Sequence, residues 1–110
     1  MIPWAKPYLY GNEKDLVAQA IQSTWISGGP YVEQFENNVA KLIDSKFALS
    51  TSNGTTAIHA AFLTIRISPG DEVIVPGFGF LAAANIALQM GAKPVFAEVD
   101  SETWCMNSTS

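Results

Sequence analysis

Apolar residues recur at helical spacing through the first half of the chain. Over residues 12–24, one stripe follows an i, i+1, i+4, i+5 pattern and is formed by Leu16, Val17, Ala20 and Ile21. Over residues 31–44, a second stripe is formed by Val32, Phe35, Val39, Leu42 and Ile43. Two glycines and a proline in the segment 27–30 interrupt the pattern. We therefore expect two amphipathic helices, with Asn12 as the N-cap of the first, and an extended aromatic arm over residues 1–11.

The second half of the chain alternates short apolar runs with longer apolar segments. The short runs predict strands, because a strand buried on both faces shows no polar alternation; they are residues 47–51, 72–75 and 94–99. The longer segments predict helices at residues 57–67 and 81–90, the first of them too apolar for a surface position. This β-α-β-α-β order with short connections predicts an α/β domain with helices around a short, mostly parallel sheet.

The expected organisation is a single domain or a fragment of one. Residues 1–45 would form the arm and the two amphipathic helices, and residues 46–110 the β-α-β-α-β unit. A sheet of three strands has two open edges, and the chain ends soon after a strand. We therefore expect the sequence to be the first part of a larger fold.

The composition excludes several classes of protein. With 48% hydrophobic and 15% charged residues, the 110-residue chain is too apolar for a disordered protein. A net charge of −4 with only six Lys and Arg argues against binding to nucleic acid. No apolar run reaches the roughly 18 residues of a membrane span, and the start lacks the apolar core of a signal peptide. The single cysteine, Cys105, can form no internal disulfide and, with one histidine, no zinc site, so we expect a cytoplasmic protein without a structural metal.

The turn from the strand at 47–51 into the next helix, Ser52–Thr56, is a candidate phosphate site. Gly54 allows close approach of the backbone to a ligand, and the free N–H groups of a helix start attract an anion. The hydroxyls of Thr55 and Thr56 add donors. The alternative is a capped helix whose hydroxyls serve only its own backbone. The segment lacks the Gly-Lys-Ser/Thr of a Walker loop and the three-glycine spacing of a dinucleotide site.

A second candidate is the loop Gly77–Phe80, at the carboxyl end of the strand at 72–75. Ligands of open α/β sheets bind at that edge, and an aromatic side chain there can stack on a flat ring. Taken alone, the loop favours a flexible turn with both phenylalanines in the core. Taken together with the phosphate site, it suggests a phosphorylated aromatic cofactor.

Five blocks of residues, in one order, resemble the DegT/DnrJ/EryC1/StrS family of pyridoxal-phosphate (PLP) sugar aminotransferases. They are Gly11–Glu13, Trp25–Val32, Ser52–His59, Pro69–Pro76 and Gly91–Phe96, and the resemblance covers about residues 2–107. It implies the large domain of the aspartate-aminotransferase (PLP transferase) fold, here incomplete. It also implies a dimer or other homo-oligomer that moves an amino group, usually from glutamate, to a keto group on a nucleotide-linked deoxysugar. Dehydratases share the fold, and the sequence does not separate the two activities.

The resemblance assigns roles to particular positions. Gly54 and Thr55, with Thr56 beside them, would hold the PLP phosphate, and Phe80 would stack on the pyridine ring. The segment with Ser27, Gly28, Gly29 and Tyr31 would lie near the active site and the subunit interface. Gly77 and Gly79 stand where the family commonly has Ser and Thr, which would loosen the loop before Phe80.

The family's Schiff-base lysine and the carboxylate that pairs with the pyridine nitrogen would lie beyond residue 110. A lysine that forms a Schiff base needs apolar surroundings. None of the lysines present is expected to lie in an apolar pocket of that kind: Lys6, Lys14, Lys41, Lys46 and Lys93. We therefore expect no catalytic residue here and no transamination by this chain alone.

Two other functions remain open. The chain could be a non-catalytic module that oligomerises through its aromatic arm and open sheet edges. It could also bind a different phosphorylated small molecule at the same helix start.

Overall fold

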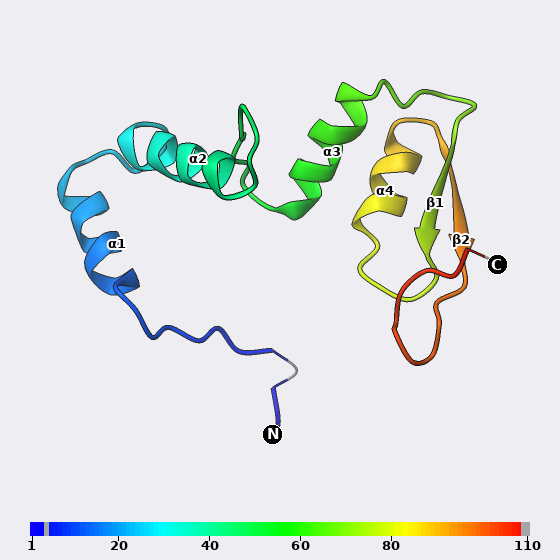
Figure 1. Ribbon diagram of the computed structural model, residues 1–110, viewed down its shortest axis with the longest axis horizontal. Helices are drawn as coiled ribbons and strands as arrows, with labels where there is room; N and C mark the ends of the chain where they lie inside the picture. The colour runs from blue at the N-terminus through cyan, green and yellow to red at the C-terminus, as the bar shows by residue number, and fades with distance from the viewer. Residues whose placement is uncertain (4, 109–110) are drawn as a thin grey trace. The chain divides into compact units, whose positions relative to one another are not determined.

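The computed structural model describes residues 1–3 and 5–108 (Figure 1). The chain divides into two compact units, the first ending at Ser50 and the second beginning at Thr51. Within the described residues, no helix combines the length and the apolar character needed to cross a membrane.

The first unit contains the two predicted amphipathic helices, α1 (Glu13–Gln22) and α2 (Pro30–Leu42). Asn12 is at the N-cap of α1 as expected, but its side chain makes no capping hydrogen bond. Instead, the carboxylate of Glu13 accepts a hydrogen bond from the backbone N–H of Gly11 at 2.8 Å. Pro30 begins α2, where its missing N–H costs no helical hydrogen bond.

The prediction of a strand over residues 47–51 is wrong. This segment is irregular, and Phe47 and Leu49 are 75% and 78% exposed. A strand needs a neighbour that pairs with its backbone, and among the described residues the segment has none. The N–H of Ser50 donates to the carboxylate of Glu36 on α2 at 2.8 Å instead. The segment is thus held by a side chain of α2 and not by a neighbouring strand.

The second unit is a β-α-β arrangement preceded by a helix. Its elements are α3 (Gly54–Thr64), β1 (Glu72–Pro76), α4 (Ala82–Gln89) and β2 (Lys93–Ala97). The two strands pair in parallel, with a register from Glu72 opposite Lys93 to Pro76 opposite Ala97. The α/β class and the parallel sheet are therefore confirmed, although the described sheet has two strands rather than three.

The core of the second unit lies around α4, which contacts α3, β1 and β2. The buried residues of this unit are Val75, Ala82, Ala84, Ile86, Ala87 and Ala92. Small side chains on α4 allow its backbone to pack closely on the strands. The expectation that α3 is buried is wrong, because none of its residues is buried and Leu63 is 59% exposed. The sequence of α3 is apolar on all sides, but among the described elements of this unit only α4 makes extensive contact with it, so most of the α3 surface stays uncovered.

Candidate functional site

The first turn of α3 is closed by a reciprocal cap. The side chain of Asn53 accepts a hydrogen bond from the N–H of Thr56 at 3.0 Å, and the N–H of Asn53 donates to the Thr56 hydroxyl at 3.3 Å. This capping box satisfies two of the four donors that a helix start leaves unpaired. In the described part of the chain, the backbone N–H groups of Gly54 and Thr55 have no acceptor. The cap therefore leaves two adjacent donors at the positive end of the helix dipole, which favour an anion.

The two threonines of this turn differ in what their hydroxyls do. The Thr56 hydroxyl donates to the backbone oxygen of Asn53 at 2.8 Å, so it is already committed to the cap. The Thr55 hydroxyl has no hydrogen-bond partner among the residues described. Thr55 is thus the threonine whose side chain is available to a ligand.

A cavity of about 450 Å³ opens beside these donors. Its lining consists of Asn53, Gly54, Thr55, Ile58, Pro76, Phe80, Ala82 and Ala83. The volume lies in the roughly 300–1,000 Å³ range of small-molecule sites. The structure thus brings together three of the four residues predicted to bind a cofactor, Gly54, Thr55 and Phe80, and leaves Thr56 outside the lining.

The apolar part of the lining was not predicted. Ile58 lies one turn after Gly54 on α3, and Ala82 and Ala83 begin α4. The spacing of four residues from Gly54 is the signal that places Ile58 on the same side of the helix. These side chains give the cavity an apolar wall next to its polar end, which suits a ligand with a charged group and a flat ring.

The loop that carries Phe80 is fixed at its first residue. The N–H of Gly77 donates to the backbone oxygen of Ala97 at 2.8 Å, extending the β1–β2 pairing by one residue. A Cβ at position 77 would lie 3.0 Å from that oxygen, so glycine permits the close approach here. The expected loosening is therefore not seen at this end of the loop.

The prediction that both phenylalanines of the Gly77–Phe80 loop lie in the core is wrong. Phe78 is 65% exposed and Phe80 is 87% exposed. The buried residues of this unit lie on β1 and α4 and at Ala92, so the loop is outside the core. The exposed ring of Phe80 is available to stack on a planar ligand in the cavity that it lines.

The predicted interface segment lies in the first unit, at the start of α2. Gly29 is the N-cap of α2 with φ of 131°, and a Cβ there would lie 2.6 Å from the ring of Trp25. Tyr31, in the first turn of α2, is half-buried, whereas Ser27 and Gly28 are exposed. The four residues therefore form the turn into α2, and the cavity described above is built from the second unit alone.

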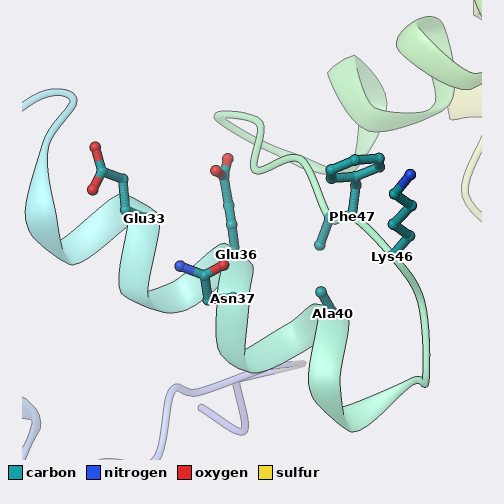
Figure 2. Close-up of a pocket in the computed structure, with 7 residues that line it drawn as sticks. Glu33, Glu36, Asn37, Ala40, Lys46 and Phe47 are labelled. Carbon is teal, nitrogen blue, oxygen red and sulfur yellow. The ribbon is translucent and has the colours of Figure 1, made fainter.

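A second hollow, of about 290 Å³, lies within the first unit (Figure 2). Figure 2 shows Glu33, Glu36, Asn37 and Ala40 on α2 beside Lys46 and Phe47 of the following segment. The ammonium nitrogen of Lys46 lies 5.2 Å from the centre of the Phe47 ring.

The Glu36 carboxylate in this hollow is already engaged. It accepts hydrogen bonds at 2.8 Å from both the N–H and the hydroxyl of Ser50. The backbone donor first, and then the hydroxyl, hold the pKa of Glu36 below its ordinary value. The Glu36 carboxylate thus links α2 to the segment after it by hydrogen bonds, which is a structural role and not that of a ligand site.

The sequence and the structure both match one family of enzymes. The profile of the DegT/DnrJ/EryC1/StrS aminotransferase family matches residues 7–110. GDP-perosamine synthase of Escherichia coli O157:H7 is 45% identical over 107 residues, which are 96% of this chain and 29% of that protein. GDP-perosamine synthase of Vibrio cholerae is 44% identical over 104 residues, 94% of this chain and 28% of that protein. The chain thus spans less than a third of the curated relatives that it matches.

Solved structures with the same fold include two enzymes with different chemistry. An aminotransferase from Psychrobacter cryohalolentis is 37% identical with a TM-score of 0.76, over 90% of this chain and 25% of that one. GDP-4-keto-6-deoxy-D-mannose-3-dehydratase of E. coli, with bound hydrated PLP, is 27% identical with a TM-score of 0.83, over 96% of this chain and 28% of that one.

Proposed function

Because the chain belongs to the DegT/DnrJ/EryC1/StrS aminotransferase family, whose cofactor is PLP, we propose that it is the N-terminal part of a sugar aminotransferase. The complete enzyme would transfer an amino group from an amino donor to the keto group of a nucleotide-linked deoxysugar. This substrate class is supported by the GDP-sugar names of the relatives and of one structural neighbour. The family description favours transamination over the dehydration carried out by that neighbour.

The observation that carries the proposal is a pair of backbone donors, on two residues that line an apolar cavity. The N–H groups of Gly54 and Thr55 have no acceptor in the described chain, and the exposed ring of Phe80 lines the same cavity. A phosphomonoester carries about −1.5 to −2 charges at neutral pH and has strong acceptor oxygens. These residues therefore fit the phosphate and the ring of PLP.

Each residue would make its own contribution to binding. The N–H groups of Gly54 and Thr55 would donate charge-assisted hydrogen bonds to the phosphate, and the Thr55 hydroxyl would add a third. Phe80 would cover one face of the pyridine ring and exclude water from it. Thr56 would act indirectly, because its hydroxyl holds the capped turn in place. When bound, PLP supplies an electron sink, and these residues only hold and orient it.

The lysine that joins PLP covalently in this family would come from outside residues 1–110. Lys93 illustrates why a lysine of this chain is unsuited to that role. Its ammonium lies 2.9 Å from the carboxylate of Glu72, and both side chains are exposed. The hydrogen bond that Lys93 donates to Glu72, and then the negative charge of that carboxylate, raise the pKa of Lys93. A nucleophilic amine needs the opposite shift.

The proposal is tested by following the amide NMR signals of the purified chain during titration with PLP. Saturable shifts at Gly54, Thr55 and Phe80 are expected. Thr55→Val removes one donor to the phosphate and should weaken PLP about tenfold, given the usual strength of a hydrogen bond to a charged group. Thr64→Val, which changes a threonine in the last turn of the same helix, is the matched control and should bind as the wild type does. Equal affinity for both variants would contradict the proposed cradle.

Exposed apolar surface supports a second candidate, a non-catalytic module that self-associates. On α1, Leu16, Val17 and Ile21 are between 52% and 63% exposed, and Tyr8 and Tyr10 of the arm stack with ring centres 5.4 Å apart. Sedimentation equilibrium separates the two functions. Concentration-dependent association without PLP binding would favour the module, and a PLP-binding monomer would contradict it.

A further inference from the structure

The segment after β2 forms a closed turn that reaches back to the end of the sheet. Val99 pairs with Met106 in an antiparallel bridge. The N–H of Asp100 donates to the oxygen of Cys105, and the N–H of Trp104 donates to the oxygen of Asp100, both at 2.9 Å. In Figure 1 this loop, residues 98–107, runs from orange to red past the carboxyl end of β1. The backbone is thus held at both sides of the turn.

One carboxylate holds the middle of this turn. Asp100 accepts hydrogen bonds from the N–H and the hydroxyl of Thr103, at 2.8 and 3.0 Å, and from the N–H of Glu102 at 3.1 Å. These donors, with the Thr103 N–H first, hold the pKa of Asp100 below its ordinary value. The carboxylate therefore stays ionised at neutral pH and keeps the turn closed.

The closed turn fixes the direction of Trp104. This residue has φ of 58°, in the left-handed region that bulky side chains rarely adopt. Such a conformation persists only where surrounding hydrogen bonds require it. Its ring lies against Phe78, with ring centres 5.2 Å apart and planes inclined by 50°. Trp104 is 63% exposed, so burial does not account for its placement.

Phe78 links this contact to the cavity. It lies between Gly77 and Gly79 in the loop that joins β1 to α4, and Phe80 follows two residues later at the cavity wall. Gly77 is anchored to Ala97 by its N–H. After Gly77, the loop is in contact with Trp104 through the ring of Phe78. Gly79 has no side chain that could hold the loop.

We propose that Trp104 is a positioning residue, which holds the Gly77–Phe80 loop through Phe78 and so sets the ring of Phe80 against the cofactor. This inference rests on the proposed function. Trp104 does not line the cavity, so it acts on the ring of PLP through the loop and has no effect on the phosphate. A role confined to folding would weaken both parts of the site equally.

The test compares two ligands in the same variants of the chain. The shifts of the Gly54 and Thr55 amides give the dissociation constants of PLP, which has a phosphate and a ring, and of inorganic phosphate, which has no ring. Trp104→Leu should weaken PLP about fivefold, in keeping with the strength of an aromatic pair, and leave inorganic phosphate unchanged. Phe78→Leu should have the same effect, because it removes the other ring of the contact. Trp104→Phe restores a ring and should recover most of the PLP affinity.

Amide hydrogen exchange without any ligand gives a second measurement. Residues 77–80 should exchange faster in Trp104→Leu than in the wild type or in Trp104→Phe. Trp25→Leu is the matched control, because Trp25 is similarly exposed, at 58%, and lies in the first unit. It should change neither the exchange of residues 77–80 nor PLP binding.

The results separate failure of the inference from failure of the proposed function. A wild-type chain without saturable PLP shifts at Gly54 and Thr55 would overturn both. If the wild type binds PLP but Trp104→Leu loses affinity for PLP and for inorganic phosphate equally, the positioning role alone would be overturned. Unchanged loop exchange in that variant, or no recovery in Trp104→Phe, would also overturn it and leave the cofactor site standing.

Discussion

The two units differ in how much of their apolar sequence is buried. Among the described residues, the second unit buries six hydrophobic residues, and the first unit buries Ala40 alone. Both contain helices with clear apolar positions, and the stripe on α2 is better separated from its polar face than the pattern on α4. An apolar stripe therefore shows that a helix has a face to bury, but not that the nearby chain supplies the surface that buries it.

The difference follows from the order of the elements. In the second unit, β1, α4 and β2 are consecutive, and a right-handed crossover brings such a helix back onto its own strands. In the first unit, α1 and α2 are followed by the irregular segment 47–50, and no sheet is available among the described residues of this unit. Local order is sufficient for a β-α-β core, whereas the first unit has few buried contacts to hold it.

The largest expected effect is on the core of the second unit. Ile86 lies on α4 and is 4% exposed. Ile86→Ala should lower the free energy of unfolding by about 2–4 kcal/mol. The matched change Ile21→Ala, on α1 where Ile21 is 63% exposed, should cost less than about 0.5 kcal/mol. Urea unfolding followed by amide signals from each unit measures both. Equal losses would remove the contrast between the two units.

A smaller effect is expected at the turn before α2. Gly29→Ala forces a Cβ onto a residue with φ of 131° and against the ring of Trp25, which should cost about 1–2 kcal/mol. Gly28→Ala is the control, because a Cβ there meets nothing within 4 Å. Amide exchange of the first turn of α2 should increase in the first variant alone. The same exchange in both variants would show that the turn tolerates a side chain.

The smallest effect concerns two carboxylates, one in each unit. Glu36 and Asp100 both have a pKa below the ordinary value, because backbone and hydroxyl donors bind their charged forms. A lowered pKa in the folded state contributes stability above the ordinary pKa, and this contribution is lost as the pH falls through the lowered value.

Acid should therefore release the Ser50 contact in the first unit and the 98–107 turn in the second. Carboxyl ¹³C titrations between about pH 6 and about pH 2 give the two pKa values directly. Glu36→Gln should abolish the acid response of the Ser50 amide and leave that of Thr103 intact, and Asp100→Asn should do the reverse. A midpoint at the ordinary pKa for either group would contradict the assigned hydrogen bonds.

The sequence was sufficient wherever structure depends on nearby residues. All four helices, the two paired strands and their parallel arrangement follow from periodicity and element order. The strand at 47–51 was wrong because pairing requires a distant partner that a local pattern does not contain. The burial of α3 was wrong for the same reason.

The candidate site was predictable in its parts and not in its details. Gly54, Thr55 and Phe80 could be chosen from the turn, the loop and the family resemblance. The different roles of Thr55 and Thr56 could not, because they depend on which hydroxyl completes the cap with Asn53. The contact between Phe78 and Trp104 joins positions 26 residues apart and has no signal in the local pattern.

We propose that this chain carries the phosphate and ring contacts for PLP and that the lysine bound covalently to PLP lies elsewhere. This proposal is tested most directly by titrating the purified chain with PLP, following the absorbance, reducing with borohydride and measuring the intact mass. We expect saturable binding with no increase in mass after reduction. A stoichiometric adduct on one lysine of the chain, or no saturable binding at all, would contradict it.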